Sequence, residues 1–153
     1  MKHKYFPLYI DISKKNILVV GGGKIALRRI KTLLKFESSI TVVGKEIHPE
    51  IWPLADDTDC IRVIQRQYEA VDLAGKDIVL ACTDSGNVNR EIVKVCREKG
   101  ILVNAADDKA MCDFYFPSVI VKDEVVIGIG ADGENHRMVK ETREYLEKMN
   151  KKC

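Results

Sequence analysis

The 153-residue sequence predicts an α/β protein: a Rossmann-type, doubly wound parallel sheet followed by a C-terminal strand–strand–helix dimerisation arm. Three observations predict this class. Short runs rich in β-branched residues alternate with amphipathic helical stretches as far as about residue 112. A glycine-rich turn follows the first of these runs. The alternation then gives way to two strand patterns and one helix, so we expect a nucleotide-binding Rossmann domain over residues 1–112 and the arm over residues 113–153.

Five strands and two helices are expected in the first domain. A helix over residues 24–36 carries apolar residues at helical spacing on one face. A second helix over residues 87–100 is expected to end at Gly100, because glycine favours the left-handed conformation that closes a helix. Gly44 is expected to end the second strand. The strands are expected at residues 16–20, 40–43, 61–65, 77–81 and 101–105.

The arm is expected to contain a strand pair and a final helix. The stretch "FYFPSVIVKDEVVIGIG" predicts two strands joined by the charged turn Lys122-Asp123-Glu124. A helix over about residues 135–150 follows. An antiparallel pair with a lone helix is a poor continuation of a wound sheet, so the arm either packs on a second subunit or folds back on its own sheet edge. The apolar residues at helical spacing are Met138, Tyr145, Leu146 and Met149, with Thr142 among them.

Composition excludes several classes of protein. The net charge of +2, with basic and acidic residues interspersed, predicts no nucleic-acid partner. No apolar run approaches the roughly 20 residues that cross a bilayer, and the N-terminal stretch "MKHKYFPLYIDI" has no small-residue cleavage site, so we expect neither a membrane partner nor a signal peptide. The five cysteines are odd in number and lack CxxC spacing, which suits a reducing cytoplasm and predicts no metal site.

The glycine turn predicts a dinucleotide site. Gly21 to Ala26 fits the pattern G-x-G-x-x-[G/A], directly after a strand and at the start of a helix. Gly21 permits the tight turn, Gly23 lets a pyrophosphate approach the backbone, and the small Ala26 lets the helix pack closely on the strand. The N–H groups around Lys24 and Ile25 would face the phosphates at the positive end of the helix dipole. A P-loop is excluded, because no Gly-Lys-[Ser/Thr] follows.

The end of the second strand leaves the choice of nucleotide open. An acidic ribose ligand is expected about 20 residues after the glycines. Gly44 and Lys45 stand there instead, with Glu46 just beyond. Lys45 would favour the 2′-phosphate of NADP, whereas Glu46 or backbone groups would favour the 2′-hydroxyl of NAD.

Polar residues also follow the fourth and fifth strands, at the edge where open α/β sheets bind ligands. Thr83 and Asp84 follow the fourth strand, and Asp84 taken alone more often caps the next helix. Asn104 ends the fifth strand and must find a partner, either a ligand or a neighbouring loop. Asp107 and Asp108 are more often a solvated turn than a catalytic pair, but their place above the crevice favours a role for one of them.

These stretches together resemble the precorrin-2 dehydrogenase family, which comprises the dehydrogenase/ferrochelatase domains of siroheme synthases. The similarity runs from about Phe6 to Leu146. Its specific elements are an "ATD…N" segment, an N-x-x-D segment and an F-x-x-P segment in register. The stretches that carry it are "NILVVGGGKIALRRIKTLL", "ITVVGKEI", "IVLACTDSGNVNREI", "ILVNAADDKAMCDFYFPSVI" and "KETREYLEKM".

The resemblance implies NAD-dependent oxidation of precorrin-2 to sirohydrochlorin in siroheme biosynthesis, and in some members insertion of ferrous iron at the same site. It implies a homodimer with interlocked C-terminal regions, and NAD rather than NADP. The essential aspartate of the N-x-x-D segment falls on Asp107, where a carboxylate could take a proton or orient the macrocycle. The implied cofactor residues are Gly21, Gly23, Lys24 and Ile25 at the pyrophosphate, Gly44, Lys45 and Glu46 around the adenosine, and Thr83, Asp84 and Asn104 beside the same crevice.

Two departures from the family pattern stand at the C-terminal end. Residues 130–136 replace the usual Ser/Thr-Gly-Gly-x-Ser-Pro segment, so no contact by that serine carries over; His136 could be a metal or propionate ligand there, a role that such a histidine rarely has. The chain also stops at Cys153, before the longer helical region of many members, which makes chelatase activity doubtful. The rival readings are an NAD-binding sensor without catalysis and a chelatase with a vestigial NAD site.

Overall fold

The computed structural model of the chain describes residues 3–131 and 135–150. Contacts within the chain define two compact units. We call residues 11–114 the sheet unit, and we call the described residues of 3–10 and 115–150 the arm unit. The boundary predicted between residues 112 and 113 concerned functional domains and stays a prediction.

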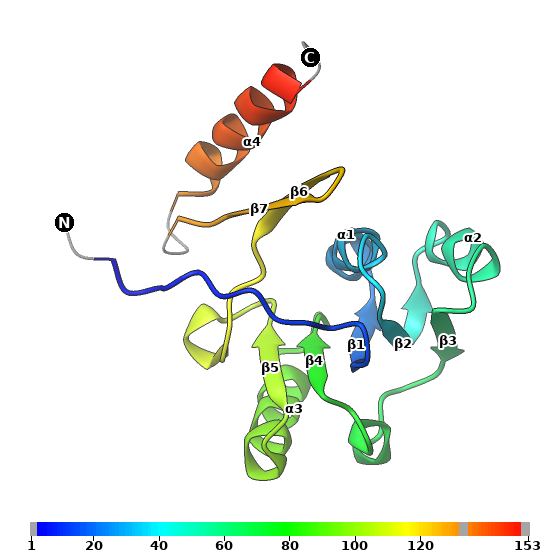
Figure 1. The fold of residues 1–153 in the computed structure, drawn as a ribbon. Coiled ribbons are helices and arrows are strands. Elements are labelled where there is room, and N and C mark those ends of the chain that lie inside the picture. Colours follow the sequence, from blue (N-terminus) through cyan, green and yellow to red (C-terminus); the bar gives the residue numbers. More distant parts are fainter. Residues whose placement is uncertain (1–2, 132–134, 151–153) are drawn as a thin grey trace. The chain divides into compact units, whose positions relative to one another are not determined.

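The sheet unit is built on five parallel strands in the order β3-β2-β1-β4-β5 (Figure 1). The chain starts in the middle of the sheet, winds outwards to β3, and then resumes on the other side of β1. This reversal is the signature of a doubly wound fold, so the predicted Rossmann-type sheet is confirmed. The strands are β1 (Asn16–Gly22), β2 (Ser39–Ile47), β3 (Ile61–Gln65), β4 (Ile78–Ala81) and β5 (Leu102–Ala105).

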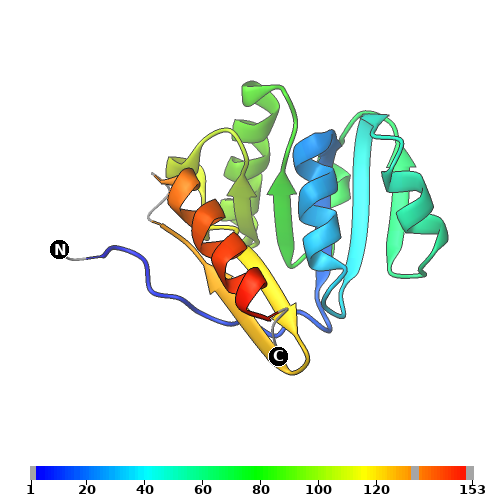
Figure 2. The same ribbon diagram turned by 90° about the horizontal axis from the view of Figure 1, so that it is seen from above.

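Helices cover both faces of this sheet. The crossover helix α1 (Lys24–Leu33) and the short α2 (Ile51–Asp56) lie on one face, and α3 (Gly86–Lys99) lies on the other (Figure 2). Since parallel crossovers are right-handed, reversing the winding direction at β1 sends α3 to the opposite face. Two 3₁₀ turns, η1 (Ala70–Leu73) and η2 (Lys109–Met111), complete the unit.

The core follows from this double cover. β1 is buried continuously from Ile17 to Val20, as expected of a central strand that is covered on both faces. Helix α1 buries Ala26, Leu27, Ile30 and Leu33, and α3 buries Ile92, Val93 and Cys96. Each large aliphatic side chain in this set contributes roughly 1.5–3 kcal/mol of transfer free energy, so the two helix faces fix the sheet firmly.

Several boundaries differ from the sequence expectation. Helix α1 ends at Leu33 instead of residue 36, whereas α3 ends before Gly100, which adopts the predicted left-handed conformation. The prediction that Gly44 ends the second strand is wrong. β2 continues to Ile47 because Gly44 pairs with Gln65 of β3 and Ile47 pairs with Gly22 of β1. Helix α2 was not predicted, since six residues containing a proline give no helical period.

The arm unit contains the predicted strand pair and helix. β6 (Ser118–Lys122) and β7 (Val125–Ile129) pair antiparallel, and α4 (His136–Asn150) follows. The N-terminal segment belongs to the same unit. The Tyr5 and Tyr115 hydroxyls are hydrogen-bonded at 2.5 Å, and the Tyr9 hydroxyl donates to the Val126 carbonyl at 3.1 Å. The altered segment 130–136 lies partly outside the described residues.

Two further findings concern the described part of the chain. It has no helix that is both long and apolar enough to span a bilayer. The cysteines Cys60, Cys82, Cys96 and Cys112 are all free thiols there.

We predict that Tyr68→Phe stabilises the sheet unit. Within the described residues the Tyr68 hydroxyl is buried without a hydrogen-bond partner, and burial raises the pKa of Tyr68 to about 12. Removing an unpaired buried hydroxyl takes away its desolvation penalty, so the free energy of unfolding should rise by about 1 kcal/mol in urea denaturation. Tyr9→Phe is the control, because it removes a hydroxyl that has a partner and should not stabilise the chain. A loss of stability in Tyr68→Phe would contradict the prediction.

Candidate functional site

The glycine turn lies between the carboxyl ends of β1 and β4. Gly21 has a φ of +103°, a conformation that side chains rarely adopt, and a Cβ there would lie 2.5 Å from the Cys82 carbonyl oxygen and 3.0 Å from the Thr83 nitrogen. Gly21 must therefore be glycine for close backbone packing. This contact also places the turn directly beside the loop that follows β4.

Gly23, unlike the closely packed Gly21, has open space beside it. A Cβ built on it meets nothing within 4 Å, and its backbone is extended at φ −81°. It precedes α1, whose first intrahelical hydrogen bond runs from the Leu27 N–H to the Gly23 carbonyl. The N–H groups of Lys24 and Ile25 therefore precede that bond, and no side chain caps the helix and no acidic residue stands in its first turn. This helix end has room and electrostatic potential for an anion.

The residues predicted to surround an adenosine lie in β2. A Cβ on Gly44 would lie 2.9 Å from the Gly22 nitrogen, so Gly44 packs against the glycine turn. Lys45 and Glu46 are exposed, and the Lys45 carbonyl accepts a hydrogen bond from the Gln65 side chain at 3.3 Å. Because consecutive strand side chains alternate between faces, at most one of these two faces the ribose.

One buried amide joins the loops after β4 and β5. Asn89 of α3 is completely buried, and its Oδ1 accepts from the Thr83 hydroxyl at 2.7 Å and the Thr83 N–H at 3.3 Å. Its Nδ2 donates to the Thr83 carbonyl at 3.1 Å and to Asp107 Oδ1 at 2.8 Å. The structure therefore brings together Thr83 and Asp107, as the sequence predicted. Asn89 itself was missed, although a polar residue on the apolar face of a helix was a usable signal.

The two other acidic residues of these loops have different positions. The suggestion that Asp84 caps α3 is wrong, because the cap is Ser85, whose side chain accepts from the Val88 N–H. Asp84 is exposed one residue earlier in the loop. Asp108 caps η2 by accepting from the Ala110 N–H at 2.9 Å. Of the adjacent pair, Asp108 is thus used structurally, and Asp107 presents an exposed carboxylate at the sheet edge.

Asn104 finds its partners within the protein. It is buried on β5, its Oδ1 accepts from Arg29 Nη1 of α1, and its Nδ2 donates to the Phe114 carbonyl at 2.7 Å. The sequence allowed either a ligand or a neighbouring part of the protein as the partner of Asn104, and the structure shows protein partners. A direct contact of Asn104 with a cofactor stays a prediction.

Cys82 follows β4 and is buried beside this site. Burial raises the pKa of the Cys82 thiol, and the nearby Arg29 opposes the shift only in part. A thiol of this kind is a poor nucleophile at neutral pH. The described residues also contain no group of three or more histidine, cysteine, aspartate or glutamate side chains that could hold a metal ion.

The arrangement fits a dinucleotide. The open backbone at Gly23 and the uncapped start of α1 suit a pyrophosphate, and they adjoin the loops of Thr83 and Asp107 through the packing of Gly21. The exposed Asp107 carboxylate at the same edge is a group that can accept a proton.

The chain is similar to known proteins over most of its length. A family model described as "Putative NAD(P)-binding" matches residues 8–118. The probable multifunctional siroheme biosynthesis protein HemA of Ruminiclostridium josui is 38% identical over 147 residues, covering 94% of this chain and 28% of the relative. The siroheme synthase of Buchnera aphidicola subsp. Acyrthosiphon pisum is 32% identical over 143 residues, covering 94% of this chain and 30% of the relative. The chain thus spans less than a third of the length of these curated relatives.

A solved structure resembles the chain as well. SirC, a precorrin-2 dehydrogenase, matches with a TM-score of 0.78 and 27% sequence identity. The match covers 94% of this chain and 70% of the SirC chain.

We predict opposite consequences for two glycine substitutions. Gly23→Ala should leave the unfolding temperature unchanged, because its Cβ meets open space, but should weaken NAD binding roughly 10-fold or more by occupying the pyrophosphate seat. Gly21→Ala should instead destabilise the fold by about 1–3 kcal/mol through its positive φ and its clash with Cys82. Calorimetric titration with NAD and thermal unfolding of both variants check this. Full NAD affinity in Gly23→Ala would contradict the assigned pyrophosphate position.

Proposed function

We propose a function from one premise: the chain belongs to the precorrin-2 dehydrogenase and siroheme synthase N-terminal family of NAD(P)-binding domains. In our proposal the chain is an NAD-dependent oxidoreductase that converts precorrin-2 to sirohydrochlorin in siroheme biosynthesis. The observation that carries the proposal is the similarity to a precorrin-2 dehydrogenase over nearly the whole chain. The coexistence of the open Gly23 turn and the Asp107 carboxylate at one sheet edge supports it.

The residues proposed to hold NAD come from four segments at that edge. The glycine turn and the start of α1 carry the pyrophosphate, the end of β2 borders the adenosine, and the loop after β4 and the end of β5 border the reacting end. In this assignment the pyrophosphate residues are Gly21, Gly23, Lys24 and Ile25, the adenosine residues are Gly44, Lys45 and Glu46, and the remaining residues are Thr83, Asp84 and Asn104.

We propose NAD rather than NADP as the cofactor, on the family resemblance. Glu46 is exposed near the end of β2, where a carboxylate can accept hydrogen bonds from a ribose 2′-hydroxyl and would repel a 2′-phosphate. Lys45 is next to Glu46 on the strand. Because consecutive side chains alternate between faces, Lys45 would point away from a ribose that Glu46 binds. The packing of Gly44 on Gly22 keeps this strand end beside the glycine turn.

Asp107 is proposed as the catalytic residue. The reaction converts precorrin-2 and NAD⁺ to sirohydrochlorin, NADH and one proton; the bound nicotinamide supplies the two-electron acceptor. The macrocycle also loses a proton, and in this proposal the Asp107 carboxylate accepts it. The exposure of Asp107 lets it return that proton to water between turnovers.

The arm unit supports the proposal of a homodimer. None of the α4 side chains described, residues 136–149, is buried, although the helix is strongly amphipathic. Met138, Tyr145 and Met149 are each more than half exposed, and their spacing of seven and four residues places them on one side of the helix. A single copy of the arm therefore leaves an apolar helix face uncovered, which a second subunit would bury.

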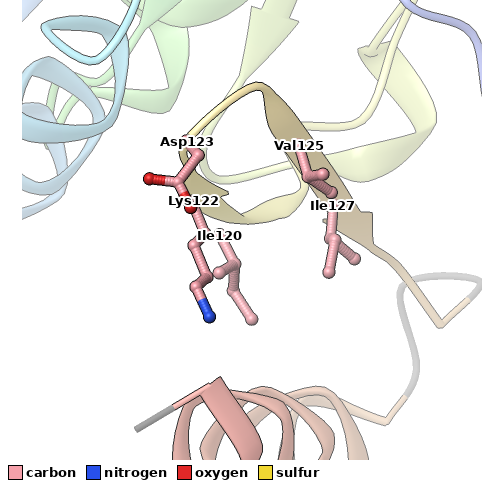
Figure 3. A pocket seen from close by; sticks show the side chains of 5 residues that line it. All are labelled: Ile120, Lys122, Asp123, Val125 and Ile127. Atoms are coloured by element: carbon pink, nitrogen blue, oxygen red, sulfur yellow. The ribbon is translucent and has the colours of Figure 1, made fainter. Parts of the chain in front are cut away.

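The β6–β7 hairpin has a further apolar recess. A cavity of about 290 Å³ is lined by Ile120, Val125 and Ile127, with Lys122 and Asp123 at the hairpin end, and it lies on the hairpin beside α4 (Figure 3). A hollow over apolar side chains of a hairpin indicates incomplete packing within one copy. We propose that residues of a partner subunit fill it.

The cytoplasm is the proposed location. Four of the cysteines are free thiols in the described chain, and two of them, Cys82 and Cys96, are buried. This use of cysteine as a small core residue is typical of proteins from reducing compartments.

Asp107→Asn should lower turnover strongly and leave NAD binding intact. The substitution removes the proton acceptor but keeps an amide oxygen that can accept from Asn89, so kcat should fall about 100-fold or more while NAD affinity and unfolding temperature stay unchanged. The assay is the absorbance of NADH and sirohydrochlorin with precorrin-2 as substrate. Asp108→Asn is the matched control, since asparagine also caps a helical turn. Wild-type turnover in Asp107→Asn would contradict the assignment.

The same assay separates the rival functions. Formation of NADH with sirohydrochlorin supports the dehydrogenase. Metal insertion into sirohydrochlorin without NADH formation would support a chelatase, and NAD binding without either reaction would support a sensor. Either of the last two results overturns the proposed function.

We predict a dimer in solution that Tyr145→Glu disrupts. Burial of an aromatic side chain at an interface contributes about 2 kcal/mol or more, so a charge at this position should raise the dimer dissociation constant at least ~30-fold. Lys148→Gln on the same helix changes the net charge equally and should leave the dimer intact. Sedimentation equilibrium measures both. A monomeric wild-type chain, or equal dissociation constants for the two variants, would contradict the prediction.

A further inference from the structure

Asn89 is a buried polar residue whose bonding capacity is completely used. It lies on the face of α3 that packs on the sheet, beside buried Ile92 and Val93, and is 0% exposed. A buried amide without partners would cost several kcal/mol, so its position is tolerated only because of the four hydrogen bonds that it makes. Three of these bonds go to Thr83, and the fourth goes to Asp107.

The backbone of Thr83 fixes the orientation of this amide. The Thr83 N–H can only donate, so the Asn89 atom that faces it must be the oxygen. The Thr83 carbonyl can only accept, so the atom that faces it must be the nitrogen. If the amide oxygen and nitrogen of Asn89 were exchanged, the nitrogen would face the Thr83 N–H, donor against donor. The oxygen would face the Thr83 carbonyl, acceptor against acceptor. The atom that meets Asp107 Oδ1 is therefore an N–H donor.

The two oxygens of Asp107 are thereby distinguished. Oδ1 accepts the Asn89 hydrogen bond, whereas Oδ2 lies by the first turn of α3, where a Cβ on Gly86 would be 3.2 Å away. Gly86 leaves this space free, and the positive end of the α3 dipole attracts the carboxylate there. The Asn89 hydrogen bond to Oδ1 therefore fixes which oxygen of the exposed aspartate is left for the substrate.

We propose that Asn89 is the positioning residue of the reaction: its Nδ2–H anchors Oδ1 of Asp107, so that Oδ2 is the oxygen that takes the proton from the tetrapyrrole. This inference rests on the proposed function. Because Asn89 is also bonded to Thr83, it couples the loop beside the nucleotide to the loop beside the substrate. The proton taken up by Oδ2 forms a new O–H bond as the substrate bond to hydrogen breaks, and the Asn89 bond to Oδ1 is kept throughout.

Asn89→Asp tests the anchor. The new side chain has the same shape and keeps an oxygen for the two Thr83 donors, but it replaces Nδ2 with an oxygen, so that the Thr83 carbonyl and Asp107 both lose their donor and face a carboxylate oxygen. Asp107 is then repelled from its position. We expect kcat to fall about 100-fold, because a displacement of about 1 Å costs that much, with KM for NAD changed less than about 2-fold. Asn87→Asp on the exposed side of the same helix makes the same charge change, keeps the oxygen bonded to Arg90, and should keep wild-type kcat.

A stability cycle tests the hydrogen bond without using activity. The double variant Asn89→Asp/Asp107→Asn reverses donor and acceptor, since an amide at position 107 can donate to the new carboxylate. We expect Asn89→Asp alone to lower the folding equilibrium constant, and the added Asp107→Asn to restore it by roughly 10-fold or more in urea denaturation. If Asn89→Asp alone fails to fold, recovery of a folded chain in the double variant is the expected result.

The outcomes separate this inference from the proposed function. No NADH formation by the wild-type chain overturns the proposed function, and the inference with it. Wild-type turnover with undiminished kcat in Asn89→Asp overturns the inference alone. Absence of any recovery in the double variant also overturns it, because Asn89 would then serve Thr83 only.

Discussion

The site depends on the parallel pairing of β1 with β4. Because both strands run in the same direction, their carboxyl ends meet at one edge, and the Gly21 turn comes to lie against the Cys82 carbonyl. This contact tolerates no side chain at Gly21. The absence of a side chain there therefore permits both the tight turn and the close approach of the two loops. The winding of the chain reverses between the same two strands, which is where doubly wound sheets open a crevice for ligands. The nucleotide seat at Gly23 and the loop of Thr83 are neighbours for this reason.

Buried amides then join the separate elements of this edge. Asn89 ties α3 to the loops after β4 and β5, and Asn104 ties β5 to Arg29 of α1 and to the Phe114 carbonyl. Each amide has partners on both its oxygen and its nitrogen, so neither carries the penalty of an unpaired polar group in the core. Networks of this kind fix geometry rather than add much net stability, because the gain from each bond is offset by lost hydration. The exposed Asp107 thereby stands on a rigid support.

Much of the fold was predictable, because it depends on local patterns. β3 appears at the predicted residues 61–65, and Gly100 ends α3 in the expected left-handed conformation. Interactions between distant residues were not predictable in the same way. β2 runs past Gly44 because Ile47 pairs with Gly22, and Ser85 rather than Asp84 caps α3 because of where the helix begins. At the site, Asp107 followed from the family resemblance. Asn89 gave only the signal of a polar residue on the apolar face of a helix, and its hydrogen bond to Asp107, 18 positions further along the chain, became visible only in the folded structure.

The central claim is that one sheet edge holds both the nucleotide and the carboxylate that acts beside it. A crystal structure of the chain with NAD bound tests this most directly. We expect the pyrophosphate on the N–H groups of Lys24 and Ile25 above Gly23, with the nicotinamide ring over the loops of Thr83 and Asp107 and the Asn89 hydrogen bond to Asp107 intact. A nucleotide seated away from the glycine turn, or a nicotinamide ring directed away from Asp107, would contradict the account.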